Sequence, residues 1–414
     1  MTVPKVLLLS RYAPGTSFVG PLILRDLCSI YPRDRICCCY FLPLPRDKQP
    51  VCSLTWLPIT HIYPEGEFGY EGRRWGKRLT EIKRAAGQWR VDFASIPRMV
   101  DQAVRFGREQ RVDLVWTTLN SPTTVRMASA VADSLGVPLV STVFDPPAHW
   151  LSYCSHDRIT IRRLLRKFGE TVRASVRCAT ASEGMKRRYE TDYGARCVVM
   201  TYGQPRSVEV MSNGKRADSD RFIIGFAGGM YATDAWNALF TTLAYRNWTI
   251  GGREVVLRVL SPKFHDPGGI PLNVQVLGWR SDAEAAALLS ECDVAYLPYW
   301  FDESYREVVQ LSFPSKLSGA VACRIPVFYH GPAESSVSLF MDRFPVGSRC
   351  HSLEESAIAE SLEAFLTQPE LRATARAACD DAYREELSAE IFRQRFAELI
   401  GIKVDDLLPC PVRG

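Results

Sequence analysis

A pair of glycines in the second half of the chain stands where a backbone can approach an anion. Gly228 and Gly229 directly follow an apolar run at residues 222–227. Two adjacent glycines at this place either let the backbone approach a phosphate group or simply turn the chain. We favour the phosphate interpretation, because the junction between a strand and the next helix is a natural anion site in an α/β sheet.

A lysine in the same half of the chain has a position suited to a diphosphate. Ser315, Lys316 and Leu317 follow Pro314, and a proline there is typical of a helix start. The lysine can neutralise a diphosphate, and the free N–H groups of the first helical turn can hold it. The alternative is that Lys316 is a solvated surface charge and Ser315 a helix cap.

Two further segments of the first half carry groups that could contact a ligand. Gly15 lies in the loop at residues 11–20, after the first apolar run, and either opens an anion site or makes a tight turn. The glycine spacing is not GxGxxG, which disfavours a dinucleotide site. Asp145 and His149 follow a second apolar run, where a carboxylate and an imidazole can take a proton from a hydroxyl group or hold a sugar. The alternative is that Asp145 caps the turn at Pro146.

The elements that must position these residues are strands that alternate with helical patterns. This alternation predicts parallel sheets covered on both faces. The expected strands of the first series are residues 5–10, 35–42, 54–60, 113–119, 138–145, 178–182 and 197–202. After an aperiodic polar segment, the expected strands of the second series are residues 222–227, 255–260, 274–277, 294–298 and 326–329. The sequence therefore predicts an α/β protein with two Rossmann-like domains.

Composition excludes several classes of protein. The 414 residues exceed the size at which one core stops growing, and 46% hydrophobic with 23% charged residues is close to the globular average. No apolar run approaches the roughly 20 residues of a membrane span, and no signal peptide is evident, so we expect a cytoplasmic protein. A net charge of +5 does not indicate a nucleic-acid-binding protein. The 13 cysteines include no CxxC pair, so we expect buried thiols and no metal site.

Basic residues cluster twice in the first half, next to aromatic or apolar residues. We expect these stretches to approach an anionic membrane surface, and solvated helix faces are the alternative. The first surrounds Trp75 and Trp89, and the second surrounds Leu164 and Leu165. Their basic residues are Arg73, Arg74, Lys77, Arg78, Lys83, Arg84 and Arg90 in the first, and Arg158, Arg162, Arg163, Arg166, Lys167, Arg173 and Arg177 in the second.

The order of these motifs over nearly the whole chain resembles the GT-B glycosyltransferases, and most nearly the family 4 group. The most specific part is the segment 292–298 followed by Pro314-Ser-Lys-Leu317. The other matching segments are residues 5–10, 179–185, 198–203, 225–228, 277–279 and 326–327.

The resemblance implies two Rossmann-like domains that face each other across a cleft. It implies an acceptor-binding domain at residues 1–205, a linker at 206–220, a nucleotide-sugar-binding domain at 221–383 and a terminal helix, about residues 384–414, that packs back on the first domain. The implied donor site comprises Gly15, Gly228, Gly229, Arg280, Tyr299, Ser315, Lys316 and Leu317, with Lys316 and the glycine pair at the diphosphate. Asp145 or His149 would lie near the sugar, and no metal or other cofactor is implied.

This sequence departs from the family pattern at residues that usually contact the nucleotide sugar. Gly319 and Leu311 stand where the family usually has glutamates, and Met230 and Ala235 replace an arginine and a lysine. The stereochemical outcome therefore stays open, since some inverting relatives use an aspartate of the first domain as base, as Asp145 would be here. The expected function is sugar transfer from a nucleotide sugar to a glycan or lipid-linked acceptor. A sugar-nucleotide epimerase and a non-catalytic partner subunit are the alternatives.

Overall fold

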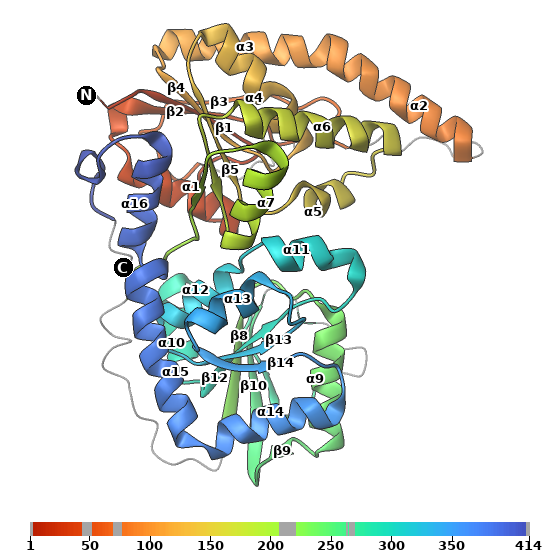
Figure 1. Cartoon of the computed structure of the whole chain (residues 1–414), viewed down its shortest axis with the longest axis vertical. Helices are drawn as coiled ribbons and strands as arrows, with labels where there is room; N and C mark the ends of the chain where they lie inside the picture. The colour runs from red at the N-terminus through yellow and green to blue at the C-terminus, as the bar shows by residue number, and fades with distance from the viewer. Residues whose placement is uncertain are drawn as a thin grey trace. The chain divides into compact units, whose positions relative to one another are not determined.

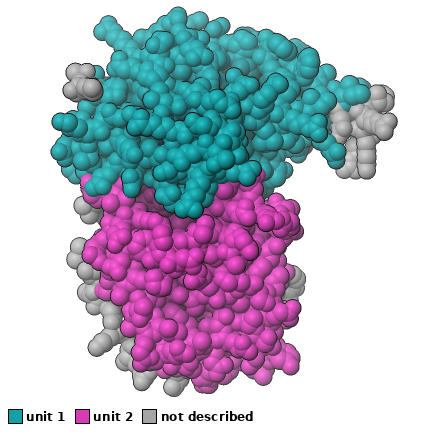
Figure 2. All heavy atoms as spheres, viewed as in Figure 1, with its two compact units in different colours: residues 1–200, 393–411 teal, residues 201–392, 412–414 magenta. Residues whose placement is uncertain are grey.

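A computed structural model describes residues 3–43, 52–68, 77–206, 221–261, 264 and 270–410. The chain forms two compact units, coloured separately in Figure 2. Unit 1 comprises Met1–Met200 and Arg393–Pro411, and unit 2 comprises Thr201–Phe392 and Val412–Gly414. Residues 207–220 of the expected linker, 206–220, lie outside the described residues, as do Arg73, Arg74 and Trp75.

Unit 1 is built on a parallel sheet with the strand order β3-β2-β1-β4-β5-β6-β7 in the described residues. Every residue of the central strands β1, β4 and β5 is buried, as expected for strands with helices on both faces. The strands are β1 (Val6–Ser10), β2 (Ile36–Tyr40), β3 (Ile59–His61), β4 (Leu114–Thr118), β5 (Leu139–Val143), β6 (Arg177–Thr180) and β7 (Cys197–Val199).

Helices of unit 1 begin and end at local signals in the sequence. The Ser121 side chain accepts a hydrogen bond from Thr124 N at the start of α4, which ends at Gly136 in the left-handed conformation. The helices are α1 (Val19–Ile30), α2 (Lys77–Arg90), α3 (Ile96–Gln110), α4 (Pro122–Leu135), α5 (Pro147–Ser152), α6 (Arg158–Ala174) and α7 (Glu183–Tyr193). A π-helical turn, Val91–Ser95, joins α2 directly to α3, so residues 77–110 are helical throughout (Figure 1).

Unit 2 repeats this architecture with the strand order β11-β10-β8-β12-β13-β14, and the short β9 pairs antiparallel with β10. Its described strands are β8 (Arg221–Ala227), β9 (Thr249–Ile250), β10 (Arg253–Leu260), β11 (Val274–Val276), β12 (Val294–Pro298), β13 (Val327–His330) and β14 (Gly347–Cys350). Its helices are α9 (Thr233–Tyr245), α10 (Asp282–Ser290), α11 (Arg306–Leu311), α12 (Ser315–Ala322), α13 (Ser336–Arg343), α14 (Glu355–Thr367) and α15 (Pro369–Ala382).

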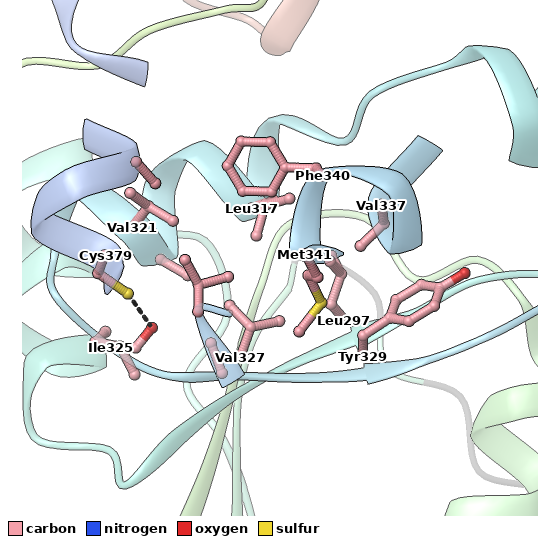
Figure 3. Close-up of a cluster of buried hydrophobic side chains, with 14 of the residues drawn as sticks. Leu297, Leu317, Val321, Ile325, Val327, Tyr329, Val337, Phe340, Met341 and Cys379 are labelled. Carbon is pink, nitrogen blue, oxygen red and sulfur yellow. Dashed lines mark hydrogen bonds between the residues drawn. The ribbon is translucent and has the colours of Figure 1, made fainter. Parts of the chain in front are cut away.

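One core of unit 2 lies between β12, β13 and the helices α12, α13 and α15. Figure 3 shows Leu317 and Val321 of α12 packed with Phe340 and Met341 of α13 over Val327 of β13. These side chains are almost completely buried. The core therefore fixes the rotation of α12 about its axis, and with it the direction of the residues on the opposite face of this helix.

The last helix, α16 (Ala389–Ile400), contributes its second half to unit 1. The Phe396 ring lies 4.9 Å from the Trp116 ring and 6.1 Å from the Tyr31 ring, between centroids. Beyond the helix, Leu408 N donates to Ile30 O at 2.7 Å. The C-terminal segment is therefore part of the core of unit 1, although it follows unit 2 in the sequence.

The structure confirms the α/β class with two Rossmann-like halves. The third strand is shorter than expected, because residues 54–57 form a turn that Leu57 N closes onto Leu54 O. Strand β14 was not predicted from the sequence. Among the described residues, no helix is long and apolar enough to cross a membrane.

Candidate functional site

The carboxyl edge of the unit 2 sheet has a switch point between β8 and β12. The chain runs from β8 to β10 on one side and reaches β12 on the other, so the loops after β8 and β12 leave in opposite directions. Ligands of open α/β sheets bind at such a point. Here the two loops are residues 228–232 and 299–302.

Gly228, the first residue after β8, lies against the side chain of Lys316. Its φ of +111° belongs to the region that favours glycine, and its N–H donates to Leu260 O at 2.9 Å. A Cβ at this residue would lie 3.0 Å from Cε and 3.4 Å from Nζ of Lys316. The glycine therefore makes room for the lysine, and the two predicted residues meet in one place.

Lys316, the second residue of α12, holds its ammonium group against aromatic rings. Its Nζ lies 4.2 Å from the centre of the Tyr231 ring and 5.5 Å from that of Phe226. In the described part of the chain, no carboxylate forms an ion pair with it. Burial lowers the pKa of Lys316 from its ordinary value of 10.5 to about 7. A bound anion would favour the charged form of Lys316, so this position suits an anion-binding site.

Aromatic rings continue from Tyr231 along the same edge. Tyr231 stacks on Trp300, with 4.7 Å between ring centroids, and Trp300 stacks on Tyr305 at 4.8 Å. Asp234 fixes this arrangement, because its Oδ2 accepts hydrogen bonds from the N–H groups of Phe301 at 2.7 Å and Asp302 at 3.2 Å. The loop after β12 is thereby tied to the start of α9. The stack was not predicted from the sequence.

The other predicted residues of unit 2 fall into two groups. Gly229 is exposed, Ser315 is the half-buried first residue of α12, and Arg280 lies half-buried on the loop after β11 and donates to Trp279 O at 2.9 Å. These three belong to the carboxyl edge. By contrast, Tyr299 and Leu317 are buried in the core. Their side chains pack inside the unit: Leu317 lies on the inner face of α12, and the Tyr299 hydroxyl donates to Ser312 O at 3.4 Å.

The predicted residues of unit 1 lie at the carboxyl edge of its own sheet. Asp145 is half-buried in the bend after β5, and His149 is half-buried in α5, where its ring meets that of Tyr153 edge-on at 5.3 Å. The cap residue of α5 is Pro146. Gly15 is buried in the loop after β1, and its N–H donates to Pro21 O at 3.0 Å, which closes the loop.

A buried ionic contact at the switch point of unit 1, between β1 and β4, was not predicted. Glu67 is 1% exposed and accepts hydrogen bonds from Thr123 N at 3.1 Å and Thr123 Oγ1 at 2.5 Å, at the start of α4. Its carboxylate lies 3.7 Å from Nε of Arg11, whose guanidinium lies over the Phe68 ring at 5.8 Å. Burial raises the pKa of Glu67. The contact fixes the loop after β1 to α4.

The fold of this chain is similar to that of several solved structures. No family model and no curated protein matches the sequence. Among solved structures, HepE from Anabaena in complex with UDP and glucose matches at 14% identity with a TM-score of 0.64, over 96% of this chain and 99% of that one. Sucrose-phosphate synthase from Thermosynechococcus elongatus matches at 11% identity with a TM-score of 0.66, over 95% and 98%.

The lipopolysaccharide outer core galactosyltransferase WaaB matches at 12% identity with a TM-score of 0.61, over 96% of this chain and 99% of that one. The similarity to these proteins therefore extends over both units and not over a single Rossmann-like half. The chain has the two-domain GT-B fold of these glycosyltransferases.

Proposed function

We propose that the chain is a glycosyltransferase that moves a sugar from a nucleotide sugar to a hydroxyl acceptor, in the synthesis of a polysaccharide, a glycolipid or another glycoconjugate. The observation that carries the proposal is the contact of Gly228 with Lys316 at the switch point of unit 2. A lysine without a carboxylate partner among the described residues, with a glycine that makes room for its side chain at the switch point, suits the diphosphate of the donor.

Lys316 would stabilise the charge that develops on the leaving diphosphate. The ammonium group is preorganised against Tyr231, so little rearrangement is needed as the bond to the sugar breaks. Ser315 and Lys316 also begin α12, whose first N–H groups have no partner within the helix and can donate to phosphate oxygens. This chemistry needs only positioning and electrostatic stabilisation, and no metal or other cofactor is part of the proposal.

Arg280 and Gly229 on the same edge are proposed donor contacts. Arg280 follows β11, two strands from β8, so it is placed to contact a part of the donor other than the diphosphate. UDP is a reasonable first nucleotide to test, because HepE was solved with UDP and glucose. For unit 1 we propose that it binds the acceptor, with Asp145 as the base and His149 as an alternative proton acceptor.

The test is binding and turnover of nucleotide sugars by the purified chain. We expect UDP, GDP or TDP to raise the melting temperature, because a ligand that binds only the native state stabilises it. Lys316→Ala should weaken binding about 10- to 100-fold, the usual value of a hydrogen bond to a charged group. Lys167→Ala on α6 of unit 1 is the matched control and should bind as the wild type does. Absence of binding and of hydrolysis with every common nucleotide sugar would overturn the proposal.

Two alternative functions, an epimerase and a non-catalytic partner subunit, can be distinguished from sugar transfer with the same purified chain. An epimerase would convert one free sugar nucleotide into another without an acceptor, which NMR of the reaction mixture detects. A non-catalytic partner subunit without a nucleotide site would release no heat with UDP or GDP in a calorimeter. A partner subunit without a nucleotide site leaves the contact of Lys316 with Gly228 unexplained. An epimerase would use the same contact, so the products of the reaction separate it from a transferase.

We also propose that helices α2 and α6 of unit 1 contact an anionic membrane surface, which suits a lipid-linked acceptor. The two helices pack together, and Arg163 of α6 lies 5.1 Å from the Trp89 ring of α2. Large apolar side chains are exposed beside basic ones on this surface. The exposed apolar residues are Ile82, Trp89, Phe93, Ile159 and Leu165, and the exposed basic residues include Lys83, Arg90, Arg158, Arg162 and Arg166. Leu164 is buried, contrary to the sequence analysis, because it lies on the inner face of α6.

Flotation with liposomes tests the membrane proposal. Aromatic and basic side chains together favour the interface of an anionic bilayer, and each nearby cation adds about 1 kcal/mol. The chain should float with vesicles that contain phosphatidylglycerol and not with pure phosphatidylcholine. Trp89→Ala together with Phe93→Ala should reduce flotation, whereas Tyr245→Ala, an exposed aromatic residue of unit 2, should not. Flotation that does not depend on anionic lipid would contradict the proposal.

A further inference from the structure

Helix α12 carries the site on the face opposite to its core face. Leu317, Ala320 and Val321 are buried, whereas Lys316 and Gly319 are only half-buried. Residues three apart lie one above the other on a helix, with about 5–6 Å between their side-chain positions. A group next to Lys316 on this face therefore lies over Gly319, which has no side chain to contact it.

The side-chain amide of Gln204 occupies the space beside Gly319. A Cβ at Gly319 would lie 3.7 Å from Oε1 and 3.8 Å from Nε2 of Gln204, so both polar atoms of the amide face this helix turn. Gln204 is half-buried. Within the part of the chain that the structure describes, its amide has no hydrogen-bond partner. An amide with two donors and one acceptor is thus available beside the lysine.

The backbone of this segment is held firmly on unit 2. Gln204 N donates to Leu387 O at 3.1 Å, and Gln204 forms a bridge with Ser388. Two residues further on, Arg206 donates to Ala322 O at 3.1 Å and pairs with Asp380 at 2.8 Å. The position of the amide is therefore set by the fold of unit 2, and it needs no ligand to bring it to α12.

We infer that Gln204 is a binding residue for the hydroxyl groups of a sugar ring joined to the diphosphate, an inference that rests on the proposed function. In a nucleotide sugar the diphosphate lies between two rings, the ribose and the transferred sugar, and both carry hydroxyl groups. When phosphate binds at Lys316, one of these rings is the next group along α12. An amide can both donate to and accept from hydroxyl groups, and it adds no negative charge beside the phosphates. Gly319 leaves the room that the ring and the amide share.

Calorimetric titrations with three ligands test this inference. Inorganic pyrophosphate has the charge without a ring, UDP adds the ribose, and UDP-glucose adds the second sugar. Gln204→Ala should leave the affinity for pyrophosphate unchanged and weaken the affinity for UDP, or for UDP-glucose alone, about 3- to 10-fold, the usual value of a neutral hydrogen bond. A loss with UDP assigns the amide to the ribose, and a loss only with UDP-glucose assigns it to the transferred sugar.

Three controls make the result decisive. Gln204→Asn keeps the amide but shortens the side chain, so it should show the same selective loss even if the alanine variant is unstable. Gln368→Ala, an exposed glutamine at the start of α15, should bind all three ligands normally. Lys316→Ala should weaken all three, pyrophosphate included.

Equal affinities of the wild type and the Gln204 variants for every ligand would overturn the inference, and so would an equal loss with pyrophosphate. If Lys316→Ala weakens UDP binding while Gln204→Ala does not, only the role of Gln204 fails. If the wild type binds none of the ligands, the proposed function itself fails.

Discussion

Nucleoside diphosphate binding should weaken as the pH rises above 7, because Lys316 must be charged to bind phosphate. Burial lowers the pKa of Lys316 to about 7, so roughly half of the free protein carries the ammonium form at pH 7 and about 1% does at pH 9. In the complex the phosphates favour the charged form, and the pKa should return to 10.5 or above. The phosphate itself, with a pKa of about 6, is about 90% ionised at pH 7 and almost completely ionised at pH 8 and 9.

The size of the effect follows from these two pKa values. With a pKa of about 7 in the free protein and about 10.5 in the complex, the affinity for UDP should fall about 50-fold between pH 7 and pH 9. At pH 8, each binding event should take up about 0.9 proton from the buffer. Both quantities come from one calorimetric series at pH 7, 8 and 9, in two buffers that differ in their heat of ionisation.

Lys316→Arg is the matched variant for this experiment. Arginine stays charged at every pH of the series, so binding by the variant should be nearly independent of pH and should take up no proton. An affinity of the wild type that is constant from pH 7 to pH 9, without proton uptake, would refute the linkage between binding and the protonation of Lys316.

Three substitutions test the fold around the sites by chemical denaturation. Gly228→Ala should lower the free energy of unfolding by about 1–3 kcal/mol, because alanine rarely adopts a φ of +111°. It should also weaken UDP binding, because the new Cβ displaces Lys316. Unchanged stability would show that the loop accommodates a side chain. Gly319→Ala should stabilise the chain by about 0.5–1 kcal/mol, because the residue lies inside a helix and the new Cβ would meet no atom closer than 3.7 Å. A loss of stability would mean that the new methyl group clashes with its neighbours. Glu67→Ala should destabilise unit 1 by about 3 kcal/mol, because it leaves the buried Thr123 N–H without its acceptor. An effect below about 1 kcal/mol would indicate that water replaces the carboxylate.

Much of the fold is present in the local sequence pattern. Apolar runs predicted the strands that flank both switch points, and Pro314 predicted the start of α12. Residues of α3 that face the core recur at helical spacing, so the local pattern contains this helix, although the sequence analysis did not name it. They are Ile96, Met99, Val100, Ala103, Val104 and Gly107.

The candidate site was predictable only where it depends on position along an element. The helical period places Leu317 on the face opposite to Lys316 and Gly319, so its burial could have been deduced from the spacing alone. The stack of Tyr231 on Trp300 brings together residues from two loops, and no periodicity relates them.

Contacts between residues far apart in the sequence could not be predicted from local patterns. Glu67 meets Thr123 across 56 residues, and Gln204 reaches a glycine of α12 from a segment that carries no motif. Such pairs follow from the order of the strands and the path of the chain between elements. A local pattern of residue types contains neither.

The central claim is that the diphosphate of a nucleotide sugar binds beside Gly228 and Lys316, and a crystal structure of the chain with UDP tests it most directly. The account predicts a phosphate oxygen at about 2.7–2.9 Å from Nζ of Lys316, a charge-assisted hydrogen bond, with the backbone of Gly228 and the first turn of α12 around the phosphates. UDP bound with its phosphates away from Lys316, or no UDP at all at saturating concentration, would contradict it.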